Sequence, residues 1–158
     1  MKTFRFFCYI VATCLLISLP SQAKNEGKVP PLLVGLWQQA VLLSSDPFPN
    51  IKYTSFYKAL NEDGSFFNLV VPGTDERGYF TQHGSFEVQS DTTYVEKIQD
   101  SPFNQFKNKD SVVKYRLDKD GKVLYLEWFE ENSKTWVSEM WIKVETPKGR
   151  SRYRNNIF

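Results

Sequence analysis

Cysteine and histidine are nearly absent from this chain, whose 158 residues include two cysteines and one histidine. Both cysteines, Cys8 and Cys14, fall in an N-terminal stretch that we expect to be removed, so the remaining chain has no thiol for a disulfide, a zinc site or nucleophilic catalysis. His83 alone cannot supply a histidine-based triad or a multi-histidine metal site. We therefore predict no metal, no cofactor and no catalytic residues.

The first residues have the layout of an export signal. Lys2 and Arg5 precede an apolar run over residues 6–19, and residues 20–23 end it with small side chains. We expect cleavage after Ala23, which makes residues 1–23 a signal peptide, and a periplasmic or extracellular location. The run is shorter than the roughly 20 apolar residues of a membrane-spanning helix, and no later run approaches that length. We therefore predict no transmembrane segment.

Lipoprotein anchoring through Cys14 is not expected. Residues 11–14 loosely resemble a lipid-attachment site, but Thr13 is bulkier than the usual residue there, and the apolar run continues beyond Cys14. We therefore expect the cleaved chain to carry no lipid.

The chain that remains after cleavage is electrically balanced. Removing residues 1–23 removes Lys2 and Arg5 and no acidic residue, which leaves 18 basic and 18 acidic residues. A neutral chain lacks the excess positive charge that favours nucleic-acid binding, so we predict no nucleic-acid partner. We divide it into a polar leader over residues 24–33, one domain over residues 34–146 and a basic tail over residues 147–158.

Segments rich in Val, Ile, Tyr, Phe and Trp recur between turn residues, which predicts an all-β fold. Eight sequential antiparallel strands can bury one face by closing into an up-and-down barrel, which also removes exposed edges. The interior of such a barrel is either just filled or holds one small ligand. The predicted strands cover residues 35–43, 51–60, 65–71, 79–88, 92–99, 111–117, 122–130 and 135–145.

One hairpin predicts which side chains of two late strands face inward. Residues 118–122 suit a three-residue loop with Gly121 in the left-handed conformation. This register pairs Tyr115 with Tyr125 and turns both tyrosines, together with Glu127, toward the interior.

The other strands are assigned by their charged residues. Placing Lys58 and Lys97 outside turns Tyr57, Tyr94 and Glu96 inward. The last strand stays open, because Trp136, Ser138, Met140, Ile142 and Val144 lie on one face and Glu139 and Trp141 on the other.

The motif Gly35-Leu36-Trp37, followed by an eight-strand meander, resembles the lipocalin and calycin superfamily. Residues 84–86, 94–98 and 139–144 are similar to small secreted lipocalin-like bacterial domains of unknown function. The resemblance implies a barrel that binds a small, partly apolar molecule. Typical lipocalins also pack an arginine of the last strand over the motif's tryptophan, and here the corresponding strand offers Lys143.

An inward set of aromatic and acidic side chains predicts a pocket for a small hydrophobic or amphipathic ligand. The alternative is a filled core in which the same phenols and carboxylates hydrogen-bond one another. The predicted ligand-binding residues are Trp37, Tyr57, Tyr94, Glu96, Tyr115, Tyr125 and Glu127.

Two other kinds of function remain open. An enzyme on the same barrel would use Glu96 with a tyrosine, or with Glu127 or Glu139, as acid and base. A protein- or glycan-interaction module would instead use aromatic side chains on the outside of the barrel. The candidates for such outer aromatics are Phe66, Trp128 and Trp141.

Overall fold

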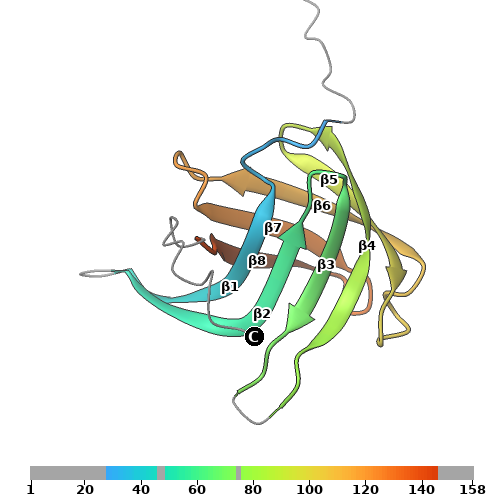
Figure 1. Ribbon diagram of the computed structural model, residues 1–158, viewed down its shortest axis with the longest axis horizontal. Coiled ribbons are helices and arrows are strands. Elements are labelled where there is room, and N and C mark those ends of the chain that lie inside the picture. Colours follow the sequence, from blue (N-terminus) through green and yellow to red (C-terminus); the bar gives the residue numbers. More distant parts are fainter. Residues whose placement is uncertain (1–27, 46–48, 74–75, 146–158) are drawn as a thin grey trace, which may run out of the picture.

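A computed structural model describes residues 28–45, 49–73 and 76–145, which form a closed barrel of antiparallel strands (Figure 1). The predicted fold class is confirmed, and the strand ends agree with the prediction to within two residues. The predicted signal peptide and basic tail lie outside the described residues. The strands are β1 (Gly35–Ser44), β2 (Asn50–Leu60), β3 (Ser65–Val70), β4 (Tyr79–Ser90), β5 (Thr93–Asp100), β6 (Lys109–Leu117), β7 (Val123–Glu130) and β8 (Thr135–Lys143).

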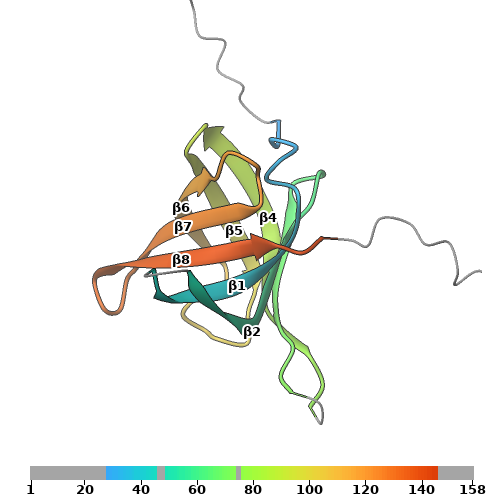
Figure 2. The same cartoon turned by 90° about the vertical axis from the view of Figure 1, so that its left-hand side faces the viewer.

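The two ends of the barrel are built differently. At one end, which we call the packed end, β1, β3, β5 and β7 begin and buried apolar side chains fill the interior. The other end, which we call the open end, carries the β5–β6 connection over residues 101–108. The segment that leads into β1 lies at the packed end (Figures 1 and 2). Fully buried side chains there include Leu33, Trp37, Leu60, Phe66, Tyr94 and Leu124.

Trp37 joins the N-terminal turn to the last strand at the packed end. Its Nε1 donates to the carbonyl of Leu33 at 3.0 Å. The Nζ of Lys143 lies 4.9 Å from the centroid of the Trp37 ring and donates to the carbonyl of Leu32 at 2.9 Å. Gly35 has a φ of +148°, and a Cβ at this position would lie 2.8 Å from Cε of Lys143. Glycine is therefore favoured there by both conformation and space.

The turn between β6 and β7 is one residue longer than predicted. The amide of Asp118 donates to the carbonyl of Val123, and Asp118 Oδ1 accepts the amides of Lys122 and Val123 at 2.7 and 2.9 Å. Gly121 takes the expected left-handed conformation, with a φ of +66°. These hydrogen bonds close a loop over residues 119–122, and the extra residue shifts the pairing register by one.

This shift turns two predicted pocket residues outward. Tyr115 pairs with Leu126 instead of Tyr125, and it is buried in the core. Tyr125 pairs with Arg116 on the outer face, where the Arg116 guanidinium carbon lies 4.1 Å from the Tyr125 ring centroid. Glu127 is exposed. The inward placement of Tyr125 and Glu127 was therefore wrong, because one residue of slip moves every side chain to the other face.

In the β2–β3 hairpin, the face opposite to the predicted one points inward. Tyr57 pairs with Leu69, and the neighbouring pair of Leu60 with Phe66 is buried in the core. Lys58, on the same face as Leu60, is only 4% exposed. Tyr57 therefore lies on the outer face, and its assignment to the pocket was wrong. Charge was a misleading guide here because Lys58 has a buried partner.

The inner faces of β5 and β8 complete the interior. Tyr94 and Glu96 are buried while Lys97 is exposed, as expected for β5. On β8 the face of Glu139 and Trp141 is the inner one, and Trp141 is 4% exposed.

Candidate functional site

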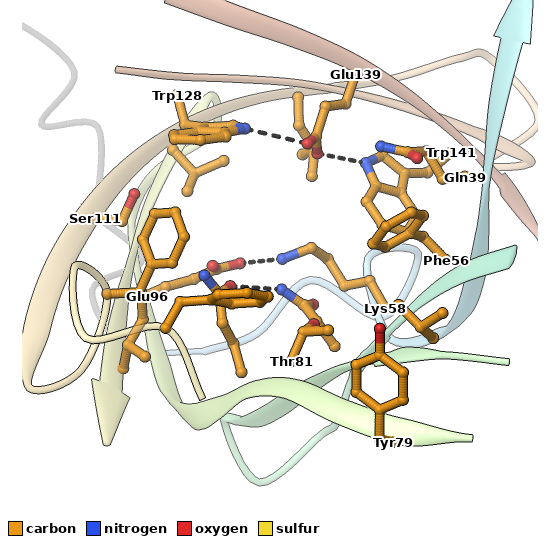
Figure 3. A pocket seen from close by; sticks show the side chains of 18 residues that line it. Gln39, Phe56, Lys58, Tyr79, Thr81, Glu96, Ser111, Trp128, Glu139 and Trp141 are labelled. Atoms are coloured by element: carbon orange, nitrogen blue, oxygen red, sulfur yellow. Dashed lines mark hydrogen bonds and ion pairs between the residues drawn. The ribbon is translucent and has the colours of Figure 1, made fainter. Parts of the chain in front are cut away.

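A cavity of about 360 Å³ occupies the open-end half of the barrel (Figure 3). Its size falls in the range of about 300–1,000 Å³ that is typical of small-molecule sites. The barrel is thus filled in one half and hollow in the other. The lining residues are Gln39, Phe56, Lys58, Asn68, Val70, Tyr79, Thr81, Gln82, Glu96, Ile98, Phe103, Phe106, Ser111, Val113, Leu126, Trp128, Glu139 and Trp141.

An ion pair joins two walls of the cavity. The Nζ of Lys58 on β2 lies 2.5 Å from Oε1 of Glu96 on β5, and both side chains are almost fully buried. The Lys58 Nζ also lies 5.3 Å from the centroid of the Phe66 ring and 5.9 Å from that of Trp141. Aromatic faces attract a cation, so these rings help to offset the loss of water around the ammonium.

Tyr94 connects this ion pair to the packed end. Its hydroxyl donates to Oε1 of Glu96 at 3.1 Å, and its ring packs at a tilted angle on Tyr115, with centroids 5.6 Å apart. Burial, and then the adjacent Glu96 carboxylate, raise the pKa of the Tyr94 phenol well above its usual value. Tyr94 therefore acts as a hydrogen-bond donor that fixes the position of the carboxylate.

Glu139 is held by two tryptophans on another side of the cavity. Its Oε1 accepts the indole Nε1 of Trp128 at 3.2 Å, and its Oε2 accepts that of Trp141 at 2.9 Å. Figure 3 shows Glu139 facing the Lys58–Glu96 pair across the hollow. Each carboxylate oxygen thus has one fixed neutral donor and remains able to accept a further hydrogen bond.

Aromatic rings form the outer part of the cavity wall. Phe106 packs edge-to-face on Trp128 at 6.2 Å and on Phe103 at 6.5 Å between centroids. The buried Ser101 hydroxyl donates to the carbonyl of Thr81 at 2.8 Å, which ties the β5–β6 connection to β4. The connection therefore brings two phenylalanines to the cavity without contributing a strand.

The entrance of the cavity is ringed by partly exposed aromatic side chains. Phe56 is 43% exposed, Tyr79 51% and Phe103 47%, and all three line the cavity. An apolar rim of this kind suits the entry of an apolar or amphipathic molecule.

A pair of amides contributes polar groups to the β3–β4 wall. Nδ2 of Asn68 donates to Oε1 of Gln82 at 2.8 Å. Oδ1 of Asn68 is buried and accepts no hydrogen bond from the described residues. The wall therefore offers an acceptor that lacks a donor.

Glu96 alone among the seven predicted ligand-binding residues lines the cavity. Trp37, Tyr94 and Tyr115 face inward but belong to the buried core cluster. The other three, Tyr57, Tyr125 and Glu127, lie on the outer face. The structure therefore divides the predicted set between core, cavity and surface.

Four important cavity residues are missing from the predicted ligand-binding set: Lys58, Trp128, Glu139 and Trp141. One signal for Lys58 was available, because a carboxylate placed inside the barrel at Glu96 calls for a buried cation. Both tryptophans, together with Phe66, are the predicted candidates for outer aromatics. All three rings lie on the inner face, which removes that proposed interaction surface.

The paired-carboxylate hypothesis is also changed by the structure. Glu127 lies outside the barrel, so it cannot act with Glu96. Glu139 does line the same cavity as Glu96. Both of these carboxylates accept hydrogen bonds from aromatic side chains: Glu96 from Tyr94, and Glu139 from the two tryptophans.

Among residues 28–45, 49–73 and 76–145, no three histidine, cysteine or acidic side chains are grouped so that they could hold a metal ion. The same ranges contain no helix with the length and apolar character needed to cross a membrane.

Comparison with known proteins identifies the family of this barrel. No curated protein matches the chain. The family described as Domain of unknown function (DUF4488) matches residues 32–150, which include all eight strands and the whole cavity lining. Since this match covers most of the chain, the protein belongs to the DUF4488 family.

Proposed function

We propose that this protein is a binding module that holds a small amphipathic or hydrophobic molecule inside the open-end half of its barrel. The observation that carries the proposal is the cavity of about 360 Å³, which combines aromatic walls with three charged side chains. Ligand sites usually have this composition, with apolar walls for affinity and a few polar groups for orientation. The packed end provides the rigid support that a preorganised site requires.

The proposed role is binding without catalysis. The Glu96 carboxylate is tied to Lys58 and Tyr94, and the Glu139 carboxylate is tied to two indoles. Such fixed hydrogen bonds suit groups that orient a ligand. This part of the proposal would be contradicted if the protein converted a bound molecule and the Glu96→Gln variant, still folded, had lost that activity.

Lipocalin-like character is part of the proposal. It is supported by Gly35 and Trp37 at the start of β1 and by Lys143 of β8, whose ammonium lies 4.9 Å from the Trp37 ring centroid. This is the position where typical lipocalins place an arginine. The N-terminal sequence further supports a location outside the cytoplasm, where a carrier would meet its ligand in the periplasm or the surrounding medium.

A neutral, environment-sensitive dye tests the proposal without assuming the charge of the ligand. N-phenylnaphthylamine should bind the purified protein with one-to-one stoichiometry and increased fluorescence. Ser111 lines the cavity, so Ser111→Trp should fill it and abolish binding. The control is Gln99→Trp at an exposed position of β5, which should bind dye like the parent. Equal binding by both variants, each shown to be folded, would overturn the proposal.

A further inference from the structure

The charges of the cavity do not balance. Among the residues that the structure describes, three charged side chains line it, namely Lys58, Glu96 and Glu139, and Lys58 is already paired with Glu96. Within the described part of the chain, no lysine or arginine forms a salt bridge with Glu139. The cavity wall therefore carries a formal charge of −1, located on Glu139.

The hydrogen bonds to Glu139 hold this charge in place. The indoles of Trp128 and Trp141 are neutral donors that reach one oxygen each, at 3.2 and 2.9 Å. Neutral donors fix the orientation of a carboxylate but leave its net charge uncompensated. Half-buried in an apolar cavity, such a carboxylate favours a cationic partner more strongly than a carboxylate in water would.

The rest of the cavity wall also suits a positive group. The aromatic rings of Phe56, Phe106, Trp128 and Trp141 line the same hollow, and their faces attract cations. Within the described part of the chain, no donor reaches the buried Oδ1 of Asn68. An amine supplies both the positive charge and the missing N–H donors.

A ligand carboxylate is less well accommodated. Of the described residues in the lining, Lys58 is the only cation, and its ammonium is held by Glu96 and lies near the rings of Phe66 and Trp141. An anionic ligand would meet an ammonium whose charge Glu96 already balances, and it would also be repelled by Glu139.

We propose that the cavity is selective for organic monocations, namely an amine carried on an apolar body, with Glu139 as the residue that determines specificity. This inference rests on the proposed ligand-binding function and adds the chemical class of the ligand. The ammonium would pair with Glu139 between the two tryptophans, and the apolar body would extend past Phe106 toward the entrance.

Three probes with the same apolar body test this selectivity: octylamine, octanol and octanoate. Their affinities for the purified protein would be measured by calorimetry at neutral pH. Octylamine should bind at least about tenfold more tightly than octanol, because a charge-assisted hydrogen bond and cation–π contacts are added in a partly desolvated site. Octanoate should bind most weakly.

Glu139→Gln should remove the preference for octylamine over octanol while changing octanol affinity by less than about threefold, since glutamine has the same size and no charge. Its Oε1 can still accept an indole hydrogen bond, while its Nε2 can only donate. The matched control is Glu127→Gln, which removes an exposed outer-face carboxylate of β7 and should keep the full preference. Circular dichroism and thermal unfolding would verify that both variants are folded.

The possible outcomes separate this inference from the proposed function. Equal affinity for all three probes, or a preference for octanoate, would overturn selectivity for amines while leaving the binding cavity in place. A preference for octylamine that survives in Glu139→Gln would overturn the role of Glu139. Failure of all three probes, together with failure of the neutral dye, would overturn the proposed function as well.

Discussion

Lys58 and Glu96 form an ion pair across the barrel interior, although β3 and β4 separate their strands in the sheet. Their side chains are only 5% and 6% exposed. A buried pair of this kind is costly to desolvate, but removing one partner costs more, because the other charge stays buried without compensation. The pair therefore fixes the relative position of two walls of the cavity.

Neutralising either partner should destabilise the protein strongly. Lys58→Met and Glu96→Gln are each expected to lower the free energy of unfolding by about 3–5 kcal/mol, as for other broken buried pairs. The double variant contains neither charge, so its loss should be smaller than the sum of the two single losses. Urea unfolding of the four proteins measures this coupling.

The exposed pair of Lys97 and Glu87 is a suitable control, with side chains 50% and 59% exposed. Solvent screens such a pair, so removing it should change stability little. Strict additivity of Lys58→Met and Glu96→Gln would show that the buried pair does not act as a unit.

Tyr94 should make the protein sensitive to high pH. Its folded-state pKa is raised above the reference value of 10.0, mainly by burial and then by Glu96. The unfolded chain therefore loses this proton at a lower pH than the folded one. The stability from this group is complete below about pH 10 and declines as pH rises toward the folded-state pKa.

Urea midpoints would be measured from pH 8 to pH 11. Above about pH 10, they should fall more steeply with pH in the parent than in Tyr94→Phe. Tyr125→Phe, on the outer face, should follow the parent. Parallel curves for the parent and Tyr94→Phe would contradict the role of burial at Tyr94.

Lys143 should stabilise the packed end through its charge. Its ammonium lies 4.9 Å from the Trp37 ring centroid and donates to the carbonyl of Leu32. Lys143→Met keeps an apolar stem but removes both interactions, and should cost about 1 kcal/mol. Lys143→Arg should retain most of this stability. An equal loss in both variants, measured by urea unfolding, would indicate that packing rather than charge matters there.

The strands could be predicted from the sequence because period-2 alternation and turn residues are local signals. The β6–β7 register could not be predicted from such signals. It depends on the Asp118 side chain, which accepts hydrogen bonds from two backbone amides and closes a loop that is one residue longer. One residue of loop length decides which face is inside. The errors at Tyr125 and Glu127 follow from that single feature.

The cavity was harder to predict than the fold because it depends on contacts between distant strands. Placing Lys58 outside followed the usual preference of lysine for water. Its burial requires Glu96, which lies 38 residues away in sequence. Similarly, the inward position of Trp128 and Trp141 is linked to their shared acceptor, Glu139.

Native mass spectrometry of the protein purified from its own host tests most directly whether the barrel is a carrier. Gentle conditions should show a complex of one protein with one small molecule, and denaturing conditions should release that molecule. The released compound should be an amine with an apolar body, and Ser111→Trp should be isolated without it. A protein that is empty under gentle conditions, and that also fails to bind the neutral dye, would contradict the binding function.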